Sequence, residues 1–310
     1  MSRASIPMLI VLAGPTAVGK SDLAMDLAER LGMEIISADS RQVYTRLEIG
    51  TARPSAADCA RVPHHLVGYV EPDEEYSAAR FARDANAVLD ELAGRGLGAI
   101  VVGGTGHYVQ ALVEGIQIPS VPPDLDFRAA LEREAEESGG GPLFERLVRL
   151  DPEAARSIPA ANVRRVIRAL EVIEKTGRRF SEVGRVRSVP RRAARLALTR
   201  DRSELYARAD ARVDAMILRG WLEEVRALMD RGYSPTGPAL TSTGYRELVA
   251  HIHGESTLDQ TVQRIKWATH AYIRRQYMWL RKQPGYRWLD LGQATLDDVE
   301  RACHEVWDAN

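Results

Sequence analysis

A phosphate-binding loop near the N-terminus constrains the fold of this chain more than any other feature. Residues 14–21 read GPTAVGKS and fit the pattern G-x-x-x-x-G-K-[ST]. The apolar run Met8–Ala13 predicts a buried strand before the loop, and helical spacing of apolar residues over Ser21–Leu31 predicts a helix after it. In this strand–loop–helix context, successive backbone N–H groups form an anion-binding nest.

The loop predicts phosphate binding and a metal cofactor. Lys20 supplies a point charge for the terminal phosphate, and the Ser21 hydroxyl is positioned to ligate Mg²⁺ bridging phosphate oxygens. The motif does not by itself indicate that a phosphoryl group moves. The predicted phosphate ligands are Gly14, Thr16, Ala17, Val18, Gly19, Lys20 and Ser21.

Alternating strand and helix signals over the first 115 residues predict the fold class. Strands are expected over Glu34–Ser37 and Ala99–Val102, with a helix over Ser77–Ala93 between them. This alternation implies an α/β fold of the P-loop NTPase kind, a parallel sheet flanked by helices. Later predicted elements are a returning strand over Arg195–Thr199, helices over Ser203–Arg219, Leu222–Arg231 and Leu258–Arg281, and a last strand over Tyr286–Leu289.

A proline-rich linker, Ile118–Pro123, marks the start of a different region. From Asp124 to Arg179 the pattern is helical only, with breaks at residues 139–142, Pro152 and Pro159. We interpret residues 119–194 as a mainly helical insertion domain and residues 1–118 and 195–310 as the catalytic core.

Polar residues follow two of the predicted strands. In an open parallel sheet, ligands bind beyond the carboxyl ends of the strands, so Asp39 is expected to face the same crevice as the loop. Asp39 could hold Mg²⁺, accept a proton from a nucleophile, or cap a turn. Thr105, in Gly-Gly-Thr-Gly, offers a hydroxyl to a ligand or caps a helix, and the neighbouring His107 is more typical of a solvated histidine.

Net charge and cysteine content limit the ligands and the cellular compartment expected for this chain. The net charge of −1 gives no global signature for nucleic acid. Two cysteines, Cys59 and Cys303, are not spaced as metal ligands, which favours a reducing compartment and the cytoplasm. The apolar segment Ile6–Ala13 is far too short to span a membrane.

A local excess of basic residues suggests where RNA would bind. Residues 164–202 contain 13 Lys or Arg against 4 Asp or Glu, a local net charge of +9. Such asymmetry is what binding to a phosphate backbone requires, although an arginine-rich solvated surface gives the same count. The basic residues are Arg164, Arg165, Arg168, Lys175, Arg178, Arg179, Arg185, Arg187, Arg191, Arg192, Arg195, Arg200 and Arg202.

Taken together, an ordered set of motifs resembles the tRNA dimethylallyltransferase, or tRNA isopentenyltransferase, family in its bacterial form. The resemblance covers nearly the whole chain, and the set is far more specific than a phosphate loop alone. The motifs are GPTAVGKS at 14–21, ADSRQVY at 38–44, IGTARP at 49–54, VPHHLV at 62–67, VVGGTGHYVQAL at 101–112, RALEVIEKTG at 168–177, STGYRE at 242–247 and RRQYMWLR at 274–281.

The resemblance implies a reaction and roles for residues. A dimethylallyl group passes from dimethylallyl diphosphate to the exocyclic N6 of the adenine 3′-adjacent to the tRNA anticodon. Asp39 would be the general base, the loop and Mg²⁺ would hold the diphosphate, Thr105 would lie beside the reacting centre, and Arg212 would contact the diphosphate. The target base would be flipped out of its stack, because a stacked base cannot react.

The resemblance also implies how tRNA binds a monomeric enzyme, and three positions depart from the family pattern. His107 stands where leucine is usual, and His270 and Ala271 replace Arg and Gln. The residues expected to contact the anticodon stem-loop are Asp39, Ser40, Arg41, Gln42, Thr105, Arg128, Arg164, Arg165 and Arg168.

Three other functions are compatible with parts of the sequence. A P-loop kinase of a small metabolite would use Asp39 to hold Mg²⁺. A prenyltransferase of free adenine nucleotides would not need the basic insertion. A non-catalytic RNA-binding protein would not need Lys20, Ser21 and Asp39 together.

Overall fold

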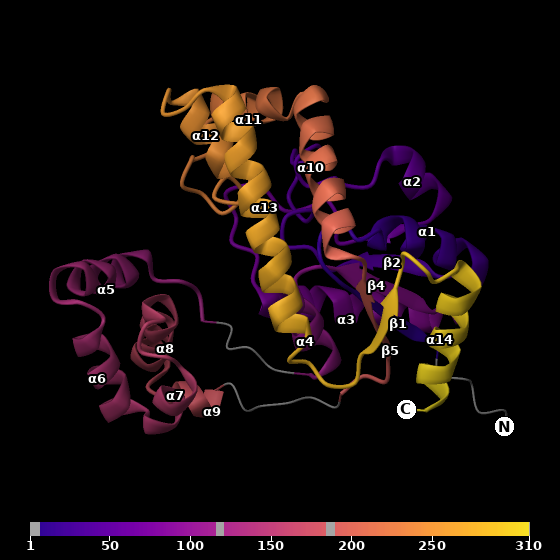
Figure 1. The fold of residues 1–310 in the computed structure, drawn as a ribbon. Coiled ribbons are helices and arrows are strands. Elements are labelled where there is room, and N and C mark those ends of the chain that lie inside the picture. The colour runs from indigo at the N-terminus through magenta and orange to yellow at the C-terminus, as the bar shows by residue number, and fades with distance from the viewer. Residues whose placement is uncertain (1–6, 116–120, 184–189, 310) are drawn as a thin grey trace. The chain divides into compact units, whose positions relative to one another are not determined.

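The structure, a computed structural model, describes residues 7–115, 121–183 and 190–309 (Figure 1). The chain forms two compact units. The first comprises residues 1–77, 81–112 and 192–310, and the second comprises residues 78–80 and 113–191. Residues 118–120 of the predicted linker Ile118–Pro123 lie outside the described residues.

One parallel sheet forms the centre of the first unit. Among the described residues it has six strands in the order β3-β2-β4-β1-β5-β6, and every neighbouring pair is parallel. This arrangement confirms the α/β class. The strands are β1 (Leu9–Ala13), β2 (Glu34–Ser37), β3 (His64–His65), β4 (Ala99–Gly103), β5 (Ala194–Thr199) and β6 (Arg287–Asp290).

The sheet is built around β1, which pairs with β4 on one side and β5 on the other. All five residues of β1 are buried, as are the four of β2. Continuous burial explains why these strands read as unbroken apolar runs rather than alternating ones. Because all strands point the same way, the segments after β1, β2 and β4 emerge at one edge of the sheet.

Helices surround the sheet and extend beyond it. Helices α1 and α14 pack on the sheet and on each other, and α10 runs beside α13 (Figure 1). The helices α1 (Lys20–Leu31), α2 (Ala56–Arg61), α3 (Ala78–Gly94), α4 (Gly106–Val113), α10 (Arg202–Leu218), α11 (Trp221–Asp230), α12 (Tyr245–Ile252), α13 (Leu258–Leu280) and α14 (Leu296–Asp308) belong wholly or mainly to the first unit.

The second unit is helical in its described residues, with its own apolar core around Leu143, Leu147 and Val166. The predicted breaks are confirmed: α5 ends at Ser138, and Pro152 begins α7. Its helices are α5 (Leu125–Ser138), α6 (Gly141–Leu150), α7 (Pro152–Ser157), α8 (Val163–Thr176) and α9 (Phe180–Val183).

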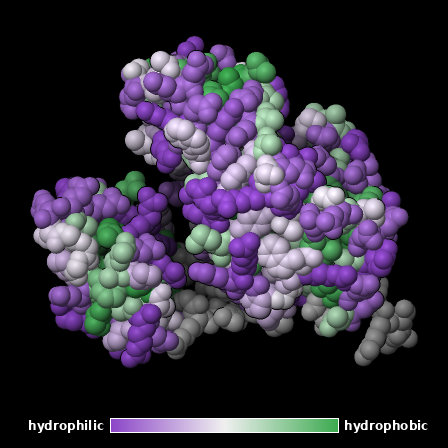
Figure 2. All heavy atoms as spheres, in the orientation of Figure 1, coloured by the Kyte–Doolittle hydropathy of each residue, from purple (hydrophilic) through white to green (hydrophobic). Residues whose placement is uncertain are grey.

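Some elements were not predicted. Strand β3 has only two residues, too few for a periodic signal. Helix α14 does carry a sequence signal, because Thr295 and Asp298 form a capping box at its start. None of the helices in the described ranges is long and apolar enough to cross a membrane. Hydrophilic residues cover most of the surface in the view of Figure 2.

Candidate active site

The phosphate loop lies between β1 and α1, as its pattern predicts. Ala17 and Gly19 have positive φ angles of 64° and 106°, which turn the chain before the helix starts. Gly19 caps α1 without a side-chain hydrogen bond, so the first N–H groups of the helix remain for a ligand. Gly14 is required because a Cβ there would lie 2.8 Å from the carbonyl oxygen of Leu198.

Two cations converge on this loop. Lys20 Nζ donates a hydrogen bond to the Pro15 carbonyl oxygen at 2.6 Å. Burial and the charge of Arg212 lower the pKa of Lys20 from 10.5 to about 7, and Asp39 opposes the shift. Burial also lowers the pKa of Arg212, which the carboxylates of Asp39 and Asp22 oppose. Two mutually repelling cations form a site that a bound polyanion stabilises.

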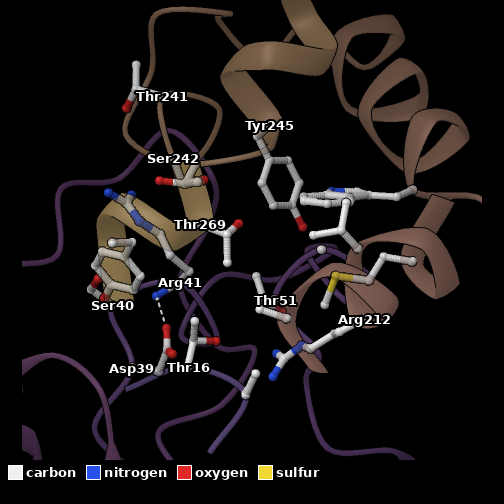
Figure 3. Close-up of a pocket in the computed structure, with 18 of the residues that line it drawn as sticks. Thr16, Asp39, Ser40, Arg41, Thr51, Arg212, Thr241, Ser242, Tyr245 and Thr269 are labelled. Carbon is white, nitrogen blue, oxygen red and sulfur yellow. Dashed lines mark hydrogen bonds between the residues drawn. The ribbon is translucent and has the colours of Figure 1, made fainter. Parts of the chain in front are cut away.

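Asp39 follows the carboxyl end of β2 and lines a cavity (Figure 3). Its Oδ1 accepts hydrogen bonds from Arg41 N at 2.8 Å and Gln42 N at 3.4 Å. Among the described residues, none donates a hydrogen bond to its Oδ2. Capping the turn and acting on a ligand are therefore compatible, since each uses a different oxygen.

Thr105 joins the ends of β2 and β4 and does not line the cavity that contains Asp39. Its Oγ1 accepts a hydrogen bond from Ser40 N at 3.1 Å, and its N–H donates to the Ala38 carbonyl oxygen at 3.2 Å. A Cβ on Gly103 would lie 2.2 Å from that same oxygen, so glycine is needed for this close approach. In the structure Thr105 therefore fixes the backbone on either side of Asp39.

Two cavities meet beside the loop. The aspartate cavity, of about 310 Å³, contains Asp39, and the loop cavity, of about 570 Å³, contains Lys20. Ala17, Arg212 and Met216 line both, so a ligand in the phosphate loop would be adjacent to one beside Asp39. Other residues of the aspartate cavity are Thr16, Ser40, Arg41, Thr51, Thr241, Ser242, Tyr245 and Thr269 (Figure 3).

Glu224 of α11, which sequence analysis did not identify, holds one wall of the aspartate cavity. Its Oε2 accepts hydrogen bonds from the N–H groups of Glu48 and Ile49, both at 2.7 Å. Its Oε1 accepts from Gly50 N at 3.2 Å and from the Tyr245 hydroxyl at 2.7 Å. Burial and the Glu224 charge raise the pKa of Tyr245, which keeps that hydroxyl protonated. Three successive N–H groups thus form a nest for one carboxylate.

Trp221 packs between two glycines of the same wall. A Cβ on Gly50 would lie 2.0 Å from the Trp221 Nε1, and one on Gly244 would lie 2.0 Å from its Cη2. The indole is only 3% exposed. These contacts explain the glycines of IGTARP and STGYRE, and they fix the spacing of two loops that line the aspartate cavity.

Gln276 of α13 joins the phosphate loop to the end of β4. Its Oε1 accepts a hydrogen bond from Thr16 N at 2.9 Å, and its Nε2 donates to the Gly104 carbonyl oxygen at 3.2 Å. A Cβ on Gly104 would lie 2.2 Å from that Nε2, so the glycine makes room for the amide. The glycine after β4 thus serves packing against α13, which the sequence alone did not indicate.

Two arginines hold the outer side of the loop. Arg208 Nε donates to the Ala17 carbonyl oxygen at 3.0 Å, and Arg200 Nε donates to the Val18 carbonyl oxygen at 3.3 Å. Sequence analysis counted Arg200 in the basic segment 164–202. The structure places it in the first unit, within the predicted core segment 195–310, and against the phosphate loop. Its charge therefore acts on the loop rather than on the surface of the insertion.

Ser21 is exposed and lines the loop cavity, beside Asp22. No group of three or more His, Cys, Asp or Glu side chains that could hold a metal occurs in the described part of the chain. Mg²⁺ usually needs only one or two protein ligands when phosphate oxygens and waters complete its shell. The residues therefore fit an ion that binds together with a diphosphate.

Arg41 and Gln42, which are predicted to contact RNA, also form hydrogen bonds within the first unit. Arg41 lines the aspartate cavity, and its Nη1 donates to the Pro238 carbonyl oxygen. Gln42 Nε2 donates to the carbonyl oxygens of Thr51 and Ala52, both at 3.2 Å. Gln42 thereby joins two motifs that are separate in the sequence.

In the second unit, buried Glu171 collects two of the predicted RNA-binding arginines. Arg128 binds its carboxylate through Nε at 2.8 Å and Nη2 at 2.9 Å, and Arg168 forms a further ion pair with it. Arg164 and Arg165, on the same helix as Glu171, are exposed. Of these four arginines, Arg128 and Arg168 pair with Glu171, and the exposed Arg164 and Arg165 do not. Arg185 and Arg187 of the basic segment 164–202 lie outside the described residues.

The departures from the family pattern have local contacts. His270 Nε2 lies 2.8 Å from Asp210 Oδ1, and its ring stacks on Tyr206 with centroids 4.0 Å apart. His107 is exposed, with its ring centroid 6.4 Å from that of Trp279. His270 of α13 therefore contacts two residues of α10.

Comparison with known proteins identifies relatives that match nearly the whole chain, including the residues of this site. A family model described as IPP transferase matches residues 42–283, and one described as isopentenyl transferase matches residues 7–64. A tRNA dimethylallyltransferase of Roseiflexus sp. (strain RS-1) is 48% identical over 96% of this chain and 98% of its own length. One from Thermomicrobium roseum is 45% identical over 97% of this chain and 93% of its own.

Solved structures of similar proteins cover nearly all of the chain. The tRNA isopentenylpyrophosphate transferase of Bacillus halodurans superposes with a TM-score of 0.73, at 34% identity, covering 97% of both chains. A eukaryotic dimethylallyltransferase acting on tRNA superposes with a TM-score of 0.79, at 28% identity, covering 96% of this chain and 77% of that one.

Inorganic diphosphate is expected to restore the charge of Lys20 when it binds. An amine with a pKa of about 7 is about 90% neutral at pH 8, and an adjacent polyanion favours its charged form. Titration calorimetry at pH 8 in buffers of different ionisation enthalpy should therefore show uptake of roughly 0.9 proton more than in Lys20→Arg, which is always charged. Equal uptake by both proteins would contradict the lowered pKa.

Replacing Glu224 by glutamine is expected to destabilise the first unit. The amide would keep one acceptor but would point N–H donors at the N–H groups of residues 48–50. Leaving such donors unsatisfied costs about 2 kcal/mol. Urea unfolding followed by tryptophan fluorescence measures this loss. Glu223→Gln, an exposed neighbour on the same helix, is the control. Similar stabilities for the two variants would argue against the nest.

Proposed function

We propose a detailed reaction from one premise. The chain belongs to the tRNA dimethylallyltransferase family and is therefore a transferase that prenylates an adenine of tRNA. In this proposal the donor is dimethylallyl diphosphate, and the acceptor is N6 of the adenine 3′-adjacent to the anticodon. The observation that carries it is the meeting of the loop cavity and the aspartate cavity at Ala17, Arg212 and Met216.

The loop cavity fits the diphosphate of the donor. Ala17, Gly19, Lys20 and Ser21 line this cavity, the first N–H groups of α1 have no side-chain cap, and Lys20 and Arg212 add positive charge. Breaking the allylic C–O bond puts negative charge on the diphosphate. Fixed donors and cations stabilise that charge without reorganising as the bond breaks.

The aspartate cavity fits the flipped adenine. A base must leave the helical stack to react, and a cavity of about 310 Å³ beside Asp39 can receive it. Tyr272 and Arg275 of α13 line this cavity and offer a ring and a guanidinium to a base. Burial and the charge of Asp39 raise the pKa of Tyr272 to about 12, which keeps its hydroxyl a donor.

In the proposed step, adenine N6 attacks C1 of the donor while the bond from C1 to the bridging oxygen breaks. The diphosphate leaves with the electron pair of that bond. The amine loses one proton to Asp39, whose Oδ2 is not used by the turn. An exocyclic amine is a poor nucleophile, so accepting this proton as the N–C bond forms lowers the barrier.

Magnesium fits the site only in the presence of the donor. Ser21 is the residue that would ligate Mg²⁺, with diphosphate oxygens and waters completing the shell. Bound there, the ion would neutralise charge developing on the leaving group. Asp22, beside it, would orient the waters of that shell.

RNA contacts outside the cavity are proposed for the second unit. Arg164 and Arg165 are exposed on α8 and suited to backbone phosphates, and Arg128 and Arg168, which pair with Glu171, are proposed as further contacts. We also propose that the enzyme acts as a monomer in the cytoplasm. Cys59 and Cys303 are not joined in a disulfide, which is consistent with a reducing compartment.

The proposed reaction is tested with the purified chain, Mg²⁺, dimethylallyl diphosphate and unmodified tRNA. Mass spectrometry of the digested nucleosides is expected to show a dimethylallyl adenosine. ATP in place of the donor is the control for the kinase alternative, and free AMP in place of tRNA is the control for the nucleotide alternative. No modified nucleoside from any tRNA with adenine after its anticodon would overturn the proposal.

Asp39→Asn is expected to slow chemistry while sparing binding. The amide oxygen can still cap the turn at Arg41 N, but the base is lost. Single-turnover rates should fall by roughly 10²–10⁴-fold, the usual worth of a general base. The Kd for tRNA should change little. Asp259→Asn, an exposed carboxylate on α13, is the matched control. An unchanged rate in Asp39→Asn would remove Asp39 as the base.

A further inference from the structure

We infer that three apolar side chains of α10, Met216, Val213 and Ala209, bind the hydrocarbon tail of the donor and limit its length. This inference rests on the proposed function. It assigns a tail-binding surface, specific for a branched five-carbon group, to residues that neither the phosphate loop nor Asp39 includes.

The three residues form one face of the helix. Positions 209, 213 and 216 are spaced by four and three residues, so their side chains lie in a row along α10. All three line the aspartate cavity, and Met216 also lines the loop cavity. Their exposed fractions are 1%, 4% and 5% for Ala209, Val213 and Met216. The row is therefore an apolar wall of the aspartate cavity that borders the junction at Met216.

Arg212 fixes the direction in which a donor lies against this wall. It is next to Val213 in the chain and lines both cavities with Met216. A donor with its diphosphate beside Lys20 and Arg212 would place C1 at the junction. From that point its apolar tail would lie against the row formed by Met216, Val213 and Ala209. One helix thus contacts both the charged and the apolar part of the donor.

The wall also has a chemical purpose. As the C–O bond breaks, C1 becomes electron-poor and could also be captured by water. Apolar side chains around the tail exclude water from that carbon. The thioether of Met216 is polarizable and adapts its shape to a branched group.

The space beyond the junction is shared, which limits tail length. The aspartate cavity has a volume of about 310 Å³ and must also receive the adenine. A tail with a second isoprene unit would leave less of this space for the base. Replacing Met216 by a smaller residue would enlarge the junction of the two cavities. Replacing Ala209 by a larger residue would fill the space along the wall.

The first experiment measures binding without catalysis. Ala209→Leu is expected to weaken dimethylallyl diphosphate by roughly 10–200-fold, the range for a methylene-scale change in an apolar pocket. The Kd of inorganic diphosphate should stay within about twofold, because the phosphate loop is untouched. Ala207→Leu makes the same change on an exposed position of α10 and should alter neither constant. Equal weakening of both ligands, or of neither, would overturn the inference.

The second experiment measures donor choice. Met216→Ala is expected to raise kcat/KM for geranyl diphosphate relative to dimethylallyl diphosphate by roughly 10-fold or more, with tRNA as acceptor. Val213→Ala provides a second enlargement if Met216→Ala folds poorly. An unchanged ratio in both variants would contradict the tail assignment. Failure of the wild type to modify tRNA would contradict the proposed function instead, and the binding experiment would still test the tail.

Discussion

Parallel pairing of β1 with β4 on one side and β5 on the other is the constraint on which the site depends. Parallel strands deliver their carboxyl ends to one edge of the sheet, so the segments after β1, β2 and β4 meet there. Gly14 and Gly103 make this convergence close enough to be useful, because each faces a neighbouring carbonyl oxygen that a Cβ would strike. The phosphate loop, Asp39 and Thr105 therefore share one region although they are far apart in sequence.

Charge then distinguishes the two cavities that meet at that edge. Lys20 and Arg212 repel each other, and burial makes their charges costly, so this side of the junction is suited to a polyanion. On the other side stand the apolar row of α10 and Asp39, whose Oδ2 accepts no hydrogen bond from any described residue. The anionic diphosphate and the uncharged adenine thus have separate sites, one on each side of C1 of the donor. This separation favours attack at carbon over attack at phosphorus.

Sequence patterns predicted the parts of the molecule with strong local signals. The loop GPTAVGKS, the buried strands and the breaks in the helical second unit were all found where expected. Contacts between distant segments were not predictable. Glu224 gave no signal, because its role comes from N–H groups some 175 residues earlier. Arg200 and Arg168 looked like surface charges, but one holds the loop and the other a buried carboxylate. Single glycines in motifs were the available clue, since Gly50 and Gly244 mark the Trp221 contact.

The claim that carbon is attacked can be tested directly with an isotope. Dimethylallyl diphosphate labelled with oxygen-18 at the oxygen between C1 and phosphorus is incubated with the chain, Mg²⁺ and tRNA. Mass spectrometry then follows the label in the products. The account predicts that all of the label leaves with inorganic diphosphate and that the prenyl group is bonded to adenine through nitrogen. Label retained on a prenyl alcohol, or a phosphorylated product, would show cleavage at phosphorus and contradict the account.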